Sequence, residues 1–125
     1  MTMGDLKKLL IVDDEETLTY TLYQVFIKAP FDCQVVTASS GEEALKKLDN
    51  NFFHLVITDI AMPGINGLEL LSIIKSSYPE TRVIIITAYG SDEREEQAYK
   101  MGADKYIEKP FDIFELKDTV FKMIE

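Results

Sequence analysis

Short apolar runs alternate along the chain with stretches whose apolar positions recur every three or four residues. The apolar runs predict five strands, at 7–12, 33–38, 54–58, 82–87 and 105–107. The intervening stretches predict five helices. The first spans 17–28, the second runs from Ser40 through Leu48, the third follows Asn66, the fourth spans 92–100, and the fifth follows Asp112. Strands that alternate with helices through short loops predict a doubly wound α/β fold with a five-stranded parallel sheet. We expect the strand order 2-1-3-4-5, one of the two common orders of such folds.

Capping residues mark where several helices begin. Ser40 with Glu43, and Asp112 with Glu115, have the spacing of capping boxes, and Asn66 and Ser91 are suited to the N-cap of the third and fourth helices. In the last helix, four apolar positions are expected to face the core: Phe114, Leu116, Val120 and Ile124.

Other residues predict where elements end and how they are placed. Ala29-Pro30 should stop the first helix, because proline disfavours helical geometry in the residue before it, and Gly102 suits the end of the fourth. The run 82–87 (RVIIIT) is the most hydrophobic of the predicted strands, which favours a central position in the sheet. The fourth helix is polar on most of its faces.

Composition narrows the class of protein. With 125 residues and 46% hydrophobic residues, residues 1–125 are expected to form a single domain. Neither a membrane-spanning run nor a signal peptide is apparent. Cys33 is the only cysteine, which fits a cytoplasmic protein in which this residue acts as a small buried hydrophobe. The formal net charge of −9 opposes direct binding to nucleic acid, which requires Lys and Arg to neutralise phosphates.

Polar residues capable of chemistry follow four of the predicted strands. Asp13 and Asp14 follow the first, Asp59 the third, Thr87 ends the fourth, and Lys109 follows the fifth. In the order 2-1-3-4-5 these strands are consecutive neighbours, so their carboxyl ends should meet in one crevice. Three close carboxylates require a cation to remain ionised together, and all-oxygen ligands suit Mg²⁺. The pattern therefore predicts a magnesium site with a hydroxyl and an ammonium group nearby.

This constellation resembles the receiver domain of two-component response regulators, with a CheY-like fold, over almost the whole chain. The matching residues are Asp13-Asp14, Asp59 followed by Met62-Pro63 and Gly67, Thr87-Ala88, and Lys109-Pro110. The resemblance implies that Asp59 accepts a phosphoryl group from a sensor histidine kinase or a phosphotransfer protein. It also implies that the domain is not an enzyme in the usual sense, although it would catalyse its own phosphorylation and slow autodephosphorylation.

The resemblance further assigns ligands at the expected site. Asp14, Asp59 and the backbone carbonyl of Ala61 would bind Mg²⁺ directly, and Asp13 would contribute through water. Lys109 and Thr87 would bind the phosphoryl oxygens, and the Lys109-Pro110 peptide bond would be cis.

The resemblance also implies a conformational switch and a lifetime for the phosphoryl group on Asp59. Phosphorylation would draw the Thr87 hydroxyl toward the phosphoryl group and let Tyr106 turn inward, which changes the surface formed by the fourth helix, fifth strand and fifth helix. That surface would control a partner, a phosphorylation-dependent homodimer or an output domain, with transcription as the expected output; this chain itself carries no output domain. Ala61 and Tyr89 occupy the positions that tune dephosphorylation, and the lack of a polar side chain at Ala61 predicts slow hydrolysis.

Three other functions compete with this interpretation. A haloacid dehalogenase-type phosphatase would place a second Asp two residues after Asp59, where this chain has Ala61. A flavodoxin would need a Ser/Thr-rich phosphate loop after the first strand, where Asp13-Asp14-Glu15-Glu16 would repel phosphate. A receiver-like module that only binds proteins would not require the intact set of acids, threonine and lysine.

Overall fold

The computed structural model describes residues 6–28 and 32–124, and it contains one parallel sheet of order β2-β1-β3-β4-β5. The predicted fold class and strand order are confirmed. The strands are β1 (Lys7–Val12), β2 (Cys33–Ala38), β3 (Leu55–Thr58), β4 (Arg82–Thr87) and β5 (Lys105–Glu108). The helices are α1 (Glu16–Phe26), α2 (Gly41–Asn50), α3 (Gly67–Ser77), α4 (Asp92–Lys100) and α5 (Ile113–Ile124).

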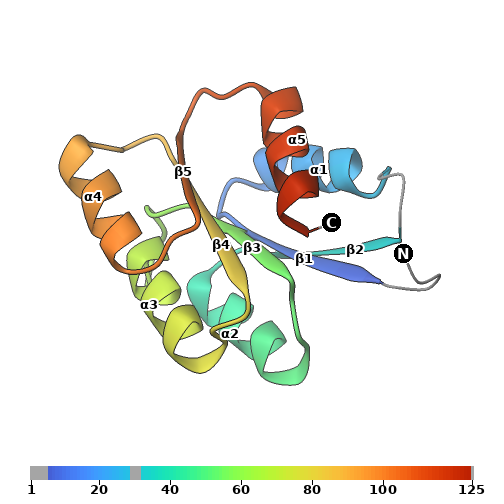
Figure 1. Cartoon of the computed structure of the whole chain (residues 1–125), viewed down its shortest axis with the longest axis horizontal. Coiled ribbons are helices and arrows are strands. Elements are labelled where there is room, and N and C mark those ends of the chain that lie inside the picture. Colours follow the sequence, from blue (N-terminus) through green and yellow to red (C-terminus); the bar gives the residue numbers. More distant parts are fainter. Residues whose placement is uncertain (1–5, 29–31, 125) are drawn as a thin grey trace.

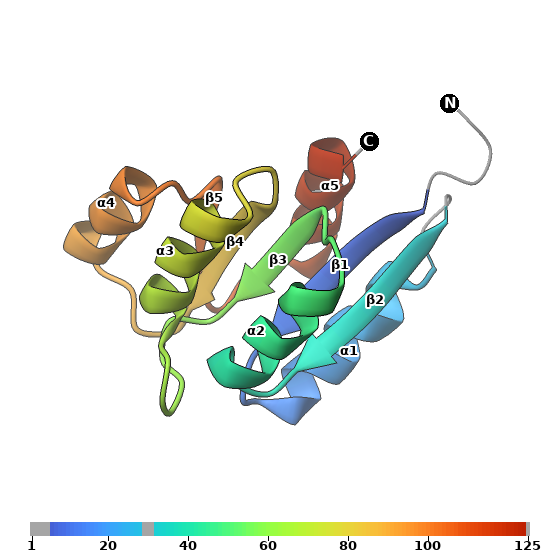
Figure 2. The same ribbon diagram turned by 90° about the horizontal axis from the view of Figure 1, so that it is seen from below.

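Helices cover both faces of the sheet, with α1 and α5 on one side and α2, α3 and α4 on the other (Figures 1 and 2). Each face has its own apolar core because alternate strand residues point in opposite directions. Leu9 and Ile11 of β1 join the core under α1 and α5, whereas Leu10 and Val12 join the core over α2 and α3. The strand end that carries the candidate residues is thus held between two packed layers.

The two most apolar strands lie inside the sheet. All four residues of β3 are buried, and in β4 every residue after Arg82 is buried. β3 occupies the middle position, and β4 lies between β3 and β5, one place from the centre. Burial on both faces explains why these strands read as continuous apolar runs rather than alternating ones.

Side-chain caps begin the helices that flank the candidate site. Asn66 and Glu69 form a complete capping box at α3. At α2 the Ser40 side chain accepts from Glu43 N, as predicted, but the Glu43 carboxylate accepts from the Ser39 hydroxyl instead. At α5 the Asp112 carboxylate accepts from the backbone N–H groups of Phe114 and Glu115.

The prediction that Phe114 of α5 faces the core is wrong. Leu116, Val120 and Ile124 are buried, but the Phe114 side chain is 69% exposed. Residues two apart on a helix point about 200° away from each other, so Phe114 cannot share the buried face of Leu116. Its ring instead lies near the Lys117 ammonium, 5.9 Å from the ring centroid.

Some sequence expectations differ in detail. β3 begins at Leu55 rather than His54, and β5 continues to Glu108. α1 ends at Phe26, while the predicted stop at Ala29-Pro30 lies outside the described residues. Cys33 is half-buried against the α1–α5 core, and burial raises the pKa of its thiol to about 11. Within residues 6–28 and 32–124, every helix is too short or too polar to span a lipid bilayer.

Candidate functional site

Strand register brings the acids of β1 and β3 together. Val12 and Thr58 are paired across the sheet, and Asp59 N donates to Val12 O at 3.1 Å. Asp13 and Asp59 are therefore the first residues beyond two neighbouring parallel strands. Both are buried, with exposed fractions of 4% and 6%, which is unusual for carboxylates without a partner.

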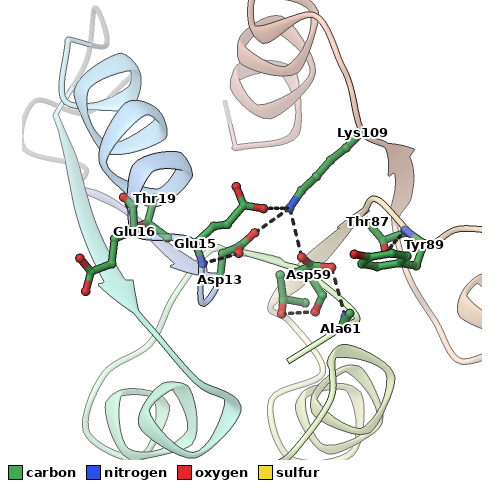
Figure 3. A network of polar contacts seen from close by, with 10 residues as sticks. Asp13, Glu15, Glu16, Thr19, Asp59, Ala61, Thr87, Tyr89 and Lys109 are labelled. Carbon is green, nitrogen blue, oxygen red and sulfur yellow. Dashed lines mark hydrogen bonds and ion pairs between the residues drawn. The ribbon is translucent and has the colours of Figure 1, made fainter. Parts of the chain in front are cut away.

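Lys109 supplies that partner from the loop after β5. Its Nζ lies 3.1 Å from Asp13 Oδ2 and 3.1 Å from Asp59 Oδ2, and 3.5 Å from Glu15 Oε1 (Figure 3). The Lys109 backbone N–H donates to Thr87 O, which fixes the loop to the end of β4. The Lys109-Pro110 peptide bond is cis, as the family resemblance implies.

Burial and ion pairing act against each other at this cluster. Burial raises the pKa of Asp13, and the hydrogen bonds from Glu15 N and Lys109 only partly oppose it. Burial alone would lower the pKa of Lys109, but its contacts with Asp59 and Asp13 outweigh burial and raise it. Lys109 is thus held in its charged form by the two carboxylates that it neutralises.

The acids can also hold a metal ion. Asp13, Asp14 and Asp59 each offer a carboxylate oxygen, and these oxygens lie within 4.8 Å of one another. Asp14 is exposed, so solvent reaches the cluster from that side. An all-oxygen donor set open to water fits Mg²⁺, which keeps several waters when bound to proteins. Ala61 is beside this cluster, since its N–H donates to Asp59 Oδ1 at 3.2 Å.

Thr87 and Tyr89 lie beside Asp59 at the end of β4 (Figure 3). The Thr87 side chain is buried, and its hydroxyl oxygen accepts from Tyr89 N at 3.1 Å. The Tyr89 side chain is 68% exposed. The Arg94 side chain of α4 donates to Tyr89 O, so this loop is linked to both the sheet and the helix.

Tyr106 already points inward in this structure. Its side chain is 6% exposed, and its hydroxyl is buried without a hydrogen-bond partner among the described residues. Burial raises the pKa of the phenol. The ring therefore occupies the inward position that the resemblance associates with phosphorylation.

Two site features escaped the sequence analysis. Glu15, exposed itself, is a third acid facing Lys109, and only its place in the acidic run 13–16 hinted at that contact. Gly67 packs directly on the phosphoacceptor candidate: a Cβ there would lie 2.0 Å from Asp59 O. No local sequence pattern reports such a contact between backbone segments.

A 2-1-3-4-5 sheet with clustered strand-end carboxylates and a facing lysine defines an aspartate-based phosphoacceptor domain of two-component signalling. The family model described as the response regulator receiver domain matches residues 9–121. The chain belongs to this family, and it is a signalling domain.

Relatives of known role share this segment. Sporulation initiation phosphotransferase F of Bacillus subtilis is 36% identical over 118 residues, which cover 94% of each chain. The response regulator FleR of Pseudomonas aeruginosa is 37% identical over 90% of this chain, and the DNA-binding transcriptional regulator NtrC of Klebsiella pneumoniae is 39% identical over 91%. In both of these the match spans only 24% of the relative's length.

Solved structures agree with the fold. TrrA of Thermotoga maritima, determined in complex with Mg²⁺ and beryllofluoride, has a TM-score of 0.82 at 38% identity, covering 94% of this chain and 99% of that one. The beryllofluoride-activated NtrC4 receiver domain dimer has a TM-score of 0.86 at 33% identity, covering 95% and 97%.

Proposed function

We propose that Asp59 accepts a phosphoryl group from a phosphohistidine of a sensor kinase or phosphotransfer protein in the cytoplasm. The observation that carries the proposal is the 3.1 Å contact between Lys109 Nζ and Asp59 Oδ2 at the edge of the acidic cluster. Asp14, Asp59 and the Ala61 carbonyl would bind Mg²⁺, with Asp13 acting through water. The structural neighbour TrrA was solved in complex with Mg²⁺ and beryllofluoride, which supports Mg²⁺ as the ion.

In the proposed reaction the phosphoryl group moves from a histidine nitrogen of the donor to a carboxylate oxygen of Asp59. An Asp59 carboxylate oxygen attacks phosphorus, the bond from phosphorus to the donor nitrogen breaks, and the imidazole leaves with a proton. Phosphoryl transfer is catalysed mainly by positioning and by cations on the equatorial oxygens. Bound Mg²⁺ supplies one such cation, and the Lys109 ammonium and Thr87 hydroxyl supply donors from the other side.

Phosphoryl uptake from acetyl phosphate with Mg²⁺ tests the proposal. The wild-type chain should gain the mass of one phosphoryl group, and Asp59→Asn should gain none while keeping its circular dichroism spectrum. Asp118→Asn, a change at an exposed residue of α5, is the matched control and should behave as wild type. Uptake by Asp59→Asn equal to that of the control would refute the assignment.

The phosphoryl group should then be lost slowly. Ala61 is exposed beside Asp59 and has no polar atom in its side chain to hold an attacking water, and Tyr89 can screen the group. Ala61→Asn adds an amide at this point and should accelerate decay of the phosphoprotein by roughly tenfold, the upper range of what one hydrogen bond to the attacking water can supply. The decay of radiolabelled protein after removal of the donor measures the rate, with Asp118→Asn as a control. An unchanged decay rate in Ala61→Asn would contradict this role.

Thr87 and Tyr106 are the proposed switch, and the surface of α4, β5 and α5 is the proposed output. Only Ala98 of α4 is buried, so this helix has few apolar contacts to keep it in place. The relative NtrC, a DNA-binding transcriptional regulator, supports transcription as the output, and the beryllofluoride-activated NtrC4 dimer supports phosphorylation-dependent dimerisation.

A further inference from the structure

The Tyr106 hydroxyl occupies a space that one glycine leaves open. A Cβ built at Gly90, in the loop between β4 and α4, would lie 2.7 Å from the Tyr106 hydroxyl oxygen and 3.0 Å from Glu108 Oε1. Gly90 has no positive φ, so alanine is compatible with its backbone conformation. Glu108 is exposed and can move aside. The buried phenol is thus the group that alanine would displace.

The backbone of Tyr106 is held separately by α4. Tyr106 N donates to the hydroxyl oxygen of Tyr99 at 3.1 Å. Because β5 is an edge strand, its outward N–H groups have no neighbouring strand to accept them. Tyr99 satisfies one of these donors and at the same time joins the C-terminal half of α4 to β5.

We propose that Gly90 and Tyr99 are positioning residues for Tyr106: Gly90 admits the ring to its inward position, and Tyr99 sets how α4 docks on β5. The inference deepens the proposed function, because it concerns the residue proposed as the switch. A side chain at position 90 would favour the outward ring, whereas loss of the Tyr99 hydroxyl would loosen α4 without moving the ring. The two residues therefore control two separable parts of one switch.

Fluorine NMR tests the role of Gly90. The full chain is labelled with 3-fluorotyrosine at all six tyrosines, and Tyr106→Phe assigns the resonance of residue 106. In the wild type this resonance should show the small H₂O-to-D₂O shift of a buried ring. In Gly90→Ala the shift should rise to that of the exposed Tyr89. A resonance that stays solvent-protected in Gly90→Ala would overturn this half of the inference.

A double-mutant cycle links the ring to the site. Gly90→Ala should weaken binding of beryllofluoride with Mg²⁺ by roughly threefold to tenfold, the cost of shifting a two-state equilibrium against the bound form. In the Tyr106→Phe background no hydroxyl opposes the new methyl group. Gly90→Ala should therefore change the affinity there by less than roughly twofold. An equal loss in both backgrounds would show that Gly90 acts independently of Tyr106.

Amide hydrogen exchange tests Tyr99. Tyr99→Phe should speed exchange at the Tyr106 amide by roughly threefold to tenfold, the range of one hydrogen bond, and leave the fluorine resonance of Tyr106 buried. Tyr20→Phe, a change at an exposed tyrosine of α1, is the control and should leave that amide unchanged. Unchanged exchange in Tyr99→Phe would overturn this half. Both NMR measurements need no phosphoryl mimic, so a wild type that failed to bind beryllofluoride would contradict the proposed function and not these assignments.

Discussion

Lys109 is the residue on which the electrostatics of the site depend. Its ammonium lies 3.1 Å from one oxygen of each of two buried carboxylates. Removing one partner of a buried charge pair leaves the other charge uncompensated, which costs more than the pair itself contributes. Asp13 and Asp59 would then repel each other across the end of the sheet.

Replacing Lys109 should therefore lower stability in the absence of metal. Lys109→Met keeps the length of the side chain, and we expect it to lower the free energy of unfolding by about 3 kcal/mol in EDTA. Saturating Mg²⁺ should restore more stability to the variant than it adds to wild type, because the metal replaces the missing cation. Urea unfolding with and without Mg²⁺ measures both effects.

A surface lysine gives the comparison. Lys100 is 74% exposed and pairs with Glu96, so Lys100→Met should cost less than about 1 kcal/mol and show no added response to Mg²⁺. If Lys109→Met lost no more stability than Lys100→Met, the ion pairs at the site would not carry the energetic role assigned to them.

At the scale of elements, the beginning of α3 positions the loop that follows Asp59. The Asn66 side chain accepts from Glu69 N at 2.9 Å, and Glu69 Oε1 accepts from Asn66 N at 3.2 Å. Gly67 N donates to Ile60 O, which closes the loop around Ala61. The cap therefore stabilises the start of the helix, and the Gly67 bond ties the loop to that start.

Loss of this cap should be measurable. Asn66→Ala should lower the free energy of unfolding by about 1 kcal/mol, the usual cost of removing an N-cap side chain. Ser72→Ala, at an exposed position within the same helix, should change stability by less than about 0.5 kcal/mol. Thermal unfolding of the two variants beside wild type makes the comparison, and equal stabilities would show that the capping box contributes nothing.

Elements with strong periodicity were predicted well, and side-chain directions less so. β1, β2 and β4 have the bounds expected from their apolar runs, and in β1 and β4 burial on both faces of the sheet produces this pattern. Phe114 is the example: an apolar residue in the first turn of α5 is expected to face the core, but Leu116, two residues later, occupies the buried face and Phe114 points to the opposite side.

The candidate site was predictable only in part. Asp13, Asp59 and Lys109 meet because parallel strands share one carboxyl edge, and this follows from the element order. The fit of Gly90 to Tyr106 depends on the β4–α4 loop and on strand β5, and no residue spacing encodes that contact.

At the scale of the whole molecule, the sheet separates two cores that unfold together. Ile74 of α3 belongs to one core and Ile124 of α5 to the other, and both are buried. Distant sites without shared partners have additive effects on stability, while a small domain unfolds as one cooperative unit.

We therefore expect the stability losses caused by substitutions in the two cores to add. Ile74→Val and Ile124→Val should each cost about 1 kcal/mol. The double variant should lose the sum within about 0.5 kcal/mol and keep the wild-type dependence on urea. Equilibrium urea unfolding of the three variants provides the values. A lower urea dependence in the double variant would indicate that the two cores unfold separately.

The close approach of Gly67 to Asp59 makes the molecule mechanically asymmetric. On the α2–α3 side, backbone meets backbone, since Cβ atoms at Gly67 and Gly41 would lie 2.0 Å from Asp59 O and 2.8 Å from Ile65 O. On the α4 side, Arg94 reaches the β4–α4 loop and Tyr99 reaches β5, each through a long side chain. We therefore expect a displacement at Asp59 to be resisted by closely packed backbone on the α3 side and to be taken up more easily by the side-chain contacts on the α4 side.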